Sequence, residues 1–261
     1  DSATLRENVV SLARNIGYVP RSRSAAKATI SFTINTTSNT PTLTLAAGLV
    51  CVGASEDTTV MFSIPSSITT TVNNGVATFD NIEVFQGTFL RKQFLVDGSL
   101  DQRFLLDNSF IDSSTIVVKV AGVSEAGTLG REYTLAQNIL NIDSTSETYL
   151  IQEVQDEKYE LLFGDGYFGK KLENGAIITA TYIITDGKDG NGSANFSYSG
   201  RVLDSIGNPV VPTNNISITT NSSAANGGDI ESIDSIKYFA PRIYASQYRA
   251  VTARDYEAII Q

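Results

Sequence analysis

Three glycines in the middle of the chain have the spacing of a nucleotide-binding loop. Gly164, Gly166 and Gly169 form a G-x-G-x-x-G pattern. Such a loop binds a pyrophosphate where it follows a strand and opens a helix, because the helix N-terminal amides then face the phosphates. Residues 159–163 supply the strand, but residues 176–185 alternate in a way that is typical of a second strand. The pattern therefore favours two antiparallel strands joined by a glycine-rich connection.

The glycine-rich connection is consequently predicted to be a structural turn motif, made of Gly164, Asp165, Gly166 and Gly169. Glycine adopts backbone conformations that other residues avoid, and an aspartate between glycines can accept hydrogen bonds from nearby amides. Asn174-Gly175, a frequent hairpin-turn pair, ends the connection. We expect these residues to serve backbone geometry rather than ligand binding.

Residues 186–192 resemble a calcium-binding loop, because they are rich in aspartate, asparagine and glycine. An EF-hand loop needs oxygen ligands at positions 1, 3 and 5, glycine at 6 and glutamate at 12. Counting from Asp186 places Lys188 at the third position, and counting from Asp189 places Ala194 at the sixth. Both registers fail, so tight turns after a strand are the favoured interpretation.

Carboxylates are the remaining candidates for catalysis. The chain has no histidine, which removes the usual general base together with Ser-His-Asp, Cys-His and histidine-zinc sites. Acidic residues within 101–112 and 153–160 could supply the paired acids of a glycosidase, but their spacing selects no pair. An acidic, solvated surface is the favoured interpretation. We predict no catalytic residue, no metal site, no cofactor and no small-molecule substrate.

The net charge of the chain indicates which kinds of binding partner are unfavourable. The chain has 19 basic and 28 acidic residues, a net charge of −9. An acidic chain argues against nucleic acid and against anionic membrane surfaces, so neither is predicted as a partner. The single cysteine, Cys51, lies between two valines and is expected to be a buried thiol. A fold without disulfides fits a reducing cytosol.

The first element is expected to be a helix, with Thr4 as its cap and Gly17 at its C-terminal end. Apolar residues recur there at helical spacing: Leu5, Val9, Leu12 and Ile16. One short helix cannot bury such a stripe by itself. Leu5, Val9 and Leu12 are therefore candidate assembly contacts.

Strand patterns dominate residues 28–200. Many short strands separated by turn signals, with no helical periods between them, predict antiparallel β structure. The expected fold class is mainly β, with antiparallel β domains flanked by short N-terminal and C-terminal helices. The expected strands are residues 28–34, 42–46, 59–64, 76–85, 89–96, 115–121, 132–135, 149–154, 159–163, 176–185 and 195–198.

The end of the chain is helical again. Residues 229–239 have apolar positions at helical spacing, with Asp229 as a candidate N-cap and Pro241 as the stop. Thr252 begins a last helix. The chain lacks an initiating methionine and stops inside this helix, so we expect a fragment of a longer protein. The apolar side of the last helix supplies further candidate assembly contacts: Tyr256, Ile259 and Ile260.

Three runs of residues, in order along the chain, resemble the baseplate J-like family. The middle run, residues 161–191, is similar to its F-G-D-G-x-F-G turn, the strand after that turn, and its G-x-x-G-N turn. The first run resembles the helix of the family and its G-Y-x-P-R/T-S exit. The last resembles its G-G-x-x-x-E-S-I, A-P-R and R-A-V-T-x-x-D-Y-E segments. The first run covers residues 8–18 and 20–22, and the last covers 227–233, 240–242 and 249–257.

The resemblance implies a structural protein of a contractile tail, the wedge protein that forms the inner ring of a phage baseplate. It implies other baseplate wedge proteins and further copies of the chain as partners, and the virion tail baseplate as location, after synthesis in the host cytoplasm. It carries over no catalytic residues. It also implies a helical region before residues 1–27 and a further region after 229–261.

We expect residues 28–88 plus 175–228 to form a β body and residues 89–174 to form an inserted β sub-domain. In this interpretation the body is a spacer, and the terminal helices transmit position between wedges during assembly and contraction. An extracellular adhesin or carbohydrate-binding β domain is the alternative, since it would also explain the threonine-rich and asparagine-rich strands.

Overall fold

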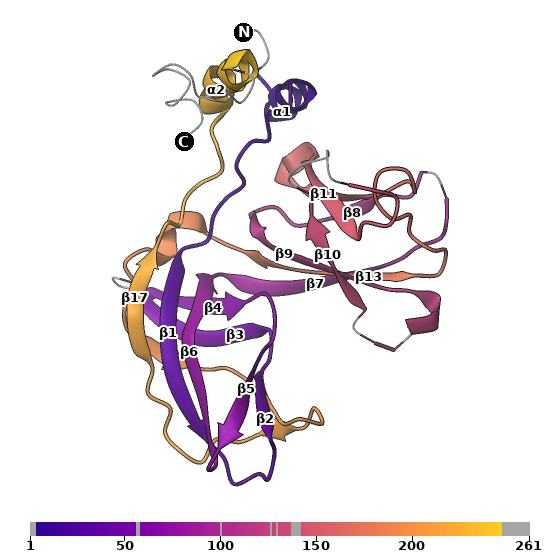
Figure 1. Cartoon of the computed structure of the whole chain (residues 1–261). Coiled ribbons are helices and arrows are strands. Elements are labelled where there is room, and N and C mark those ends of the chain that lie inside the picture. The colour runs from indigo at the N-terminus through magenta and orange to yellow at the C-terminus, as the bar shows by residue number, and fades with distance from the viewer. Residues whose placement is uncertain are drawn as a thin grey trace.

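The chain is built mainly of antiparallel β-strands, with one helix near each end of the part that is described, as predicted. The computed structural model describes residues 4–55, 58–99, 101–125, 127–128, 130–136 and 142–246. In Figure 1 two groups of strands lie side by side, and two helices lie beyond them. Two extended segments connect the helices to strands β1 and β17.

The first sheet contains ten of the named strands. Its path is β14-β3-β4-β6-β5-β2-β15-β16, and β1 joins β6 to β17. The strands are β1 (Lys27–Asn35), β2 (Thr42–Leu45), β3 (Gly48–Ser55), β4 (Thr58–Ile64), β5 (Ile68–Asn73), β6 (Val76–Gln86), β14 (Phe196–Tyr198), β15 (Val202–Leu203), β16 (Pro209–Val210) and β17 (Thr219–Ala225).

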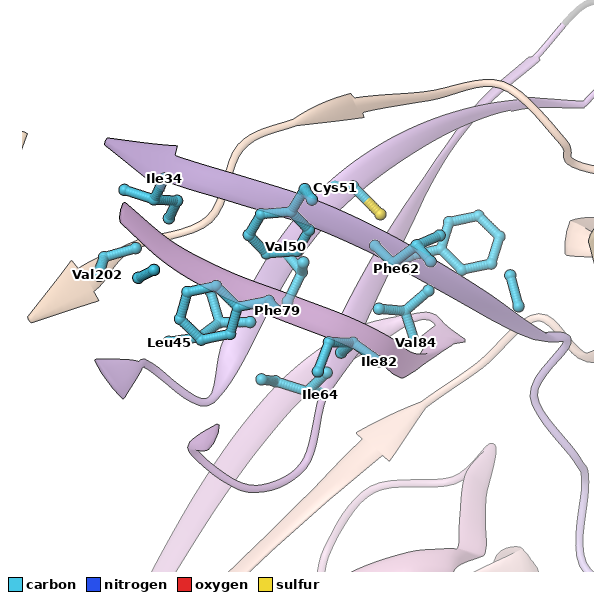
Figure 2. Close-up of a cluster of buried hydrophobic side chains, with 14 of the residues drawn as sticks. Ile34, Leu45, Val50, Cys51, Phe62, Ile64, Phe79, Ile82, Val84 and Val202 are labelled. Atoms are coloured by element: carbon cyan, nitrogen blue, oxygen red, sulfur yellow. The ribbon is translucent and has the colours of Figure 1, made fainter. Parts of the chain in front are cut away.

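The core of the first sheet follows from the alternation in its sequence. Side chains point to opposite faces of a strand at every second residue. In β1 the alternating residues Ala28, Ile30, Phe32 and Ile34 are buried. Figure 2 shows Ile34, Cys51, Phe79 and Val84 as members of one cluster of buried side chains.

The second sheet contains seven strands in the order β7-β13-β9-β10-β11-β12-β8. One pair, β10 with β11, is parallel, and the other pairs in this sheet are antiparallel. Its core contains aromatic rings such as Tyr182 and Phe104. The strands are β7 (Thr88–Leu95), β8 (Phe104–Leu106), β9 (Ile111–Ala121), β10 (Arg131–Leu135), β11 (Thr148–Glu153), β12 (Tyr159–Phe163) and β13 (Ile177–Ile184). Short 3-10 turns η1 (Val123–Glu125), η3 (Gln155–Glu157) and η4 (Gly187–Gly190) lie between strands.

The chain passes from the first sheet to the second at Gly87, the one residue between β6 and β7. Gly87 has φ +134, and a Cβ there would lie 2.2 Å from the carbonyl oxygen of Ile184 in β13. Only glycine fits both conditions. The sequence placed residues 177–184 with the β body, but β13 pairs with β7 and β9 in the second sheet. The expected domain limits otherwise stay a prediction.

Helix α1 (Arg6–Asn15) ends as its sequence predicts. Gly17 has φ +85, its amide donates to the carbonyl of Arg14, and the amide of Tyr18 donates to the carbonyl of Ala13. These two hydrogen bonds are those of a Schellman motif with glycine in the left-handed position. At the other end, Leu5 rather than Thr4 is the N-cap residue, and no side chain caps the helix.

Helix α2 (Ile233–Ser246) begins and ends later than expected. Ser232, not Asp229, caps it, since the hydroxyl of Ser232 accepts a hydrogen bond from the amide of Ser235. The prediction that Pro241 stops the helix is wrong, because Pro241 lies inside it. Proline removes one helical hydrogen bond but fits the helical φ. Neither α1 nor α2 is long and apolar enough to cross a membrane.

Candidate functional site

The glycine-rich turn after β12 is held by its own backbone. The amide of Gly166 donates to the carbonyl of Gly169 over 3.1 Å. Oδ1 of Asp165 accepts from the amides of Phe168 and Tyr167, at 2.9 and 2.8 Å. These bonds lower the pKa of the Asp165 carboxyl, and the bond from the amide of Phe168 has the largest effect. Asp165 is therefore occupied within the turn.

Close packing within the turn explains why glycine occurs there. A Cβ on Gly164 would lie 2.2 Å from the backbone of Gly169, closer than any real side chain approaches. Gly166 and Gly169 have φ values of +98 and +84, a region that favours glycine. No helix follows the turn: the next named element is β13. The arrangement has no helix N-terminus to bind a pyrophosphate.

β12 and β13 are not partners, although the sequence predicted two antiparallel strands joined by this connection. β12 pairs with β11 and β8, whereas β13 pairs with β7 and β9. The glycine-rich connection therefore crosses from one part of the second sheet to another. Asn174 and Gly175, expected to form a hairpin turn, lie in a turn that is bonded to the end of β7 instead, since the amide of Gly175 donates to the carbonyl of Val96.

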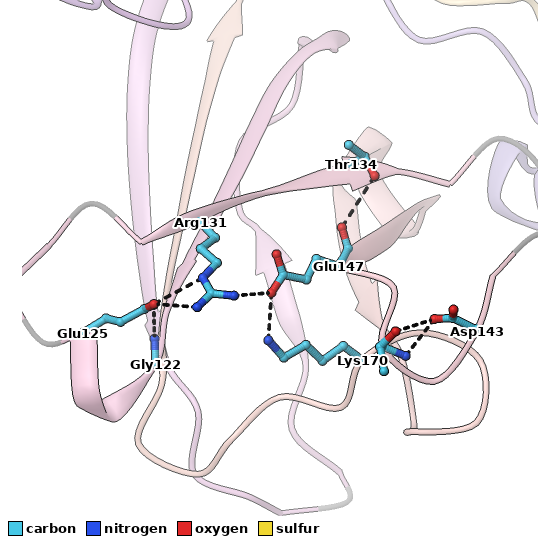
Figure 3. Close-up of polar contacts among 8 residues, drawn as sticks. Gly122, Glu125, Arg131, Thr134, Asp143, Glu147 and Lys170 are labelled. Atoms are coloured by element: carbon cyan, nitrogen blue, oxygen red, sulfur yellow. Dashed lines mark hydrogen bonds and ion pairs between the residues drawn. The ribbon is translucent and has the colours of Figure 1, made fainter.

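Charged groups fasten this connection to the loop before β11 (Figure 3). Lys170 Nζ lies 2.7 Å from the carboxylate of Glu147, which Arg131 also approaches at 3.3 Å. Arg131 also forms an ion pair with Glu125 at 3.2 Å. In the same loop, the pKa of the Asp143 carboxyl is lowered to about 2. The largest cause is the hydrogen bond that it accepts from the hydroxyl of Ser146.

The space around these groups is a cavity of about 90 Å³, lined by cations and carboxylates in similar number. Arg131 and Lys170 are already paired with carboxylates, which leaves them less available to a charged ligand. Among the residues that the structure describes, no group of three or more histidine, cysteine, aspartate or glutamate side chains could hold a metal ion.

A second region brings together all three runs on which the family resemblance rests. We call it the junction and define it as residues 18–26, 185–191 and 226–231. Ser24 and Gly228 form an antiparallel bridge, with reciprocal amide-to-carbonyl hydrogen bonds of 3.0 Å. The side chain of Asn191 brackets the backbone of Gly227, donating at 3.0 Å and accepting at 2.9 Å.

The backbones at the junction approach more closely than side chains would allow. A Cβ on Gly227 would lie 2.3 Å from the carbonyl oxygen of Gly187 and 2.9 Å from the amide nitrogen of Ala26. Gly187 lies in η4, so the loop that resembled a calcium site is packed against the chain on its way to α2. The glycines at this point permit a close three-way contact.

Glu231 is the central polar group of the junction and is 5% exposed. Its Oε1 accepts from the hydroxyls of Tyr18 at 2.6 Å and Ser235 at 2.7 Å. Its Oε2 accepts from the backbone amide of Arg21 at 3.0 Å. One carboxylate therefore joins the exit of α1, the extended segment behind it and the first turn of α2.

Arg6 links the same region to the second sheet. Its guanidinium forms a two-point ion pair with Glu153 of β11, at 2.7 and 3.1 Å, and also donates to the backbone carbonyl of Glu231. Ala25 donates its amide to the buried Asp112 of β9 at 2.8 Å. The junction thus contacts both helices and both sheets.

The two helices pack on each other through a small apolar cluster of Val9, Val10, Ala13, Ile236 and Ala240. Val9, a candidate assembly contact, is thus used inside the chain. Leu5 and Leu12, the other two, are 59% and 60% exposed, and their assembly role stays a prediction. Tyr256, Ile259 and Ile260 lie outside the described residues.

Sequence reasoning did not single out Arg6 and Glu231. Glu231 stood within a run that was noted only for its resemblance, and Arg6 stood two residues before the first run. Glutamate is seldom fully buried unless it is paired. A glutamate among glycines just before a capped helix was the available signal.

Comparison with known proteins places these features in context. No model of a protein family matches the chain. The chain is similar to the baseplate wedge protein gp6 of Enterobacteria phage T4, at 27% identity over 99% of this chain. It spans 41% of the length of that relative. The resemblance to a phage baseplate wedge protein is thereby confirmed.

Proposed function

We propose that this chain is a structural component of the baseplate of a contractile phage tail, as part of a wedge subunit in the inner ring. The observation that carries the proposal is the junction. Three runs that are far apart in the sequence meet there and fix two helices against two sheets. Similarity to a baseplate wedge protein along nearly the whole chain supports it.

The junction suggests how such a component works. The cluster between α1 and α2 holds few buried side chains, so the orientation of the helix pair depends on Glu231 and Arg6. A shift of the helices is therefore passed to β11 through Arg6 and to β1 through the segment that contains Ser24. This is the behaviour expected of a subunit that transmits conformational change during tail contraction.

The proposed partners are other baseplate wedge proteins and further copies of the chain, and the proposed location is the virion tail baseplate. Leu5, the N-cap residue of α1, and Leu12 are the proposed contact residues, because both are exposed beside Val9, which is buried on the same apolar stripe. Exposed apolar side chains on one face of an element are typical of an interface. We propose no catalytic role.

The experiment uses the full-length protein that contains this chain, expressed together with the other wedge proteins of the same virus. We expect ring-shaped assemblies in negative-stain electron micrographs. Replacing Leu5 and Leu12 by serine should reduce incorporation while the β-sheet signal in circular dichroism is kept. Ile206→Ser, at a loop position where the side chain is 81% exposed, is the control.

Absence of the wild-type protein from rings would refute the proposal. Binding of the protein to a glycan array, without ring formation, would instead support the alternative of an adhesin or carbohydrate-binding domain. Equal incorporation of the double serine variant would remove α1 as the contact and leave the structural role to be carried by other surfaces.

A further inference from the structure

We propose that the first sheet contains an open seam that accepts one extended, uncharged strand from a neighbouring baseplate protein. The inference rests on the proposed function and adds to it a docking site and the chemistry of its occupant. The seam lies between β14 and the segment of residues 214–218, which together line a cleft of about 600 Å³.

One end of the seam is closed by hydrogen bonds between β17 and the residues before β14. The amide of Ala224 donates to the carbonyl of Ser193 at 2.8 Å, and the hydroxyl of Thr220 donates to the carbonyl of Ala194 at 2.6 Å. Counted on from the contact of Ala194 with Thr220, an antiparallel register would place Phe196 opposite Ile218 and Tyr198 opposite Ile216. No hydrogen bond joins those residues in the described structure.

The free edge of β14 is defined by its pairing with β3. Asn195 and Ser199 bond to β3 through the carbonyl of Asn195 and the amide of Ser199. In an antiparallel pair the bonded residues alternate, so Ser197 also faces β3, and the backbone groups of Phe196 and Tyr198 face away from it. These outward amides and carbonyls have no partner among the described residues. Unpaired edges of this kind recruit a further strand.

The lining of the cleft indicates what fits there. Phe196, Tyr198, Ile216 and Ile218 pack against the core of the first sheet, while the surface that the cleft exposes is mainly polar, with Asn214, Asn215 and Ser217 in its lining. None of its lining residues is charged. A charged side chain would find no counter-ion there, whereas the polar groups of the lining can hydrogen-bond to an uncharged strand, so we assign an uncharged occupant. The buried hydroxyl of Tyr198 also lacks a partner.

A neighbouring protein is a better source for this strand than a second copy of the chain. Every strand named in the two sheets is already paired within its own chain. Because a strand inside the seam lies between two neighbours, a second copy would have to take a strand out of one of its own sheets, at the cost of that strand's hydrogen bonds. A segment of another protein that is extended before docking avoids that cost. Three or four residues, at about 3.3 Å each, would span β14.

Hydrogen exchange of the full-length protein, alone and in assembled wedges, tests the inference. We expect the amides of Phe196 and Tyr198 to exchange at least about tenfold more slowly in the assembly. The amide of Ser197, which faces β3, is the internal control and should be slow in both states. Wild-type wedges in which Phe196 and Tyr198 keep their exchange rates would overturn the inference, while the proposed function would stand.

Two further measurements identify the occupant. A photo-crosslinking residue at the exposed Ser217 should form an adduct with another baseplate protein, and an adduct with a second copy would overturn the assigned source. Ile216→Asp should lose the protection at β14, whereas Val211→Asp, at a position 83% exposed outside the cleft lining, should keep it. If Ile216→Asp does not fold, the wild-type exchange still decides. Failure of the wild-type protein to form wedges would count against the proposed function instead.

Discussion

Removal of the Glu231 carboxylate should release the helix pair from the sheets. In Glu231→Ala the hydroxyls of Tyr18 and Ser235 and the amide of Arg21 lose their common acceptor. The alanine cannot replace it, and the site is buried, so water reaches these donors poorly. The change acts on the contact between helices and sheets and leaves the strand pairing intact.

The size of the effect follows from the three hydrogen bonds. A hydrogen bond to a charged group contributes about 1.5–3 kcal/mol, and Tyr18 and Ser235 can recover part of the loss by turning toward solvent. The net loss is then about 4 kcal/mol, similar to the cost of breaking a buried ion pair. The small cluster of Val9 and its neighbours cannot compensate for it, since two short helices are marginal by themselves.

Hydrogen exchange under native conditions measures this loss directly, because local opening is read separately in each element. A loss of about 4 kcal/mol should speed exchange of the amides in α1 and α2 by roughly a thousandfold. Amides of β9 and β13 should keep their rates. Glu231→Gln retains an acceptor for Arg21 and two donors for the hydroxyls, so it should cost only about 1 kcal/mol.

Two results would refute this reasoning. Unchanged exchange in α1 and α2 would mean that the helices are held elsewhere. An equal rise in every element would mean that Glu231 supports the whole fold rather than the helix pair alone.

Three further predictions concern stability and reactivity. Gly227→Ala should lower the melting temperature by about 5 °C, because its methyl group forces the junction apart at a cost of about 2 kcal/mol, whereas Gly207→Ala, with open space around it, should lower it less. The hydrogen bond from Arg103 lowers the pKa of Glu160, so this pair stabilises the fold above pH 4.5 and the benefit is lost as the pH falls through the lowered pKa. Urea titrations should show a smaller cost for Arg103→Gln at pH 3 than at pH 7, and an equal cost at both would contradict the assignment. Burial raises the pKa of the Cys51 thiol to about 12, so a thiol-reactive dye at pH 8 should label the protein in urea and leave the native protein unlabelled.

Local features of the fold could be read from the sequence because they depend on neighbours in the chain. The alternation in residues 28–34 reported the two faces of β1, and Gly17 reported a left-handed helix end. The helix end predicted at Pro241 was wrong, since the φ of proline suits a helix and only the packing of α2 decides whether the helix continues.

Pairings between distant segments could not be read in this way. The alternation in β13 fits either sheet, and its partners β7 and β9 are far from it in the sequence. The close approach of Gly87 to the backbone of β13 likewise depends on two distant segments. The junction is an extreme case. Arg6, Glu153 and Glu231 are separated by many tens of residues, so no local pattern connects them.

The bridge between Ser24 and Gly228 gives the molecule a direction of mechanical strength. Both segments leave the sheets toward the helices, so a pull on the two helices together loads both segments equally. That load passes into the long pairing of β1 with β6 as shear, where many hydrogen bonds resist at once. A force that splays α1 from α2 instead opens the bridge first and then unzips β1 from β17 one pair at a time. The chain should therefore be stiff in tension and compliant in splaying.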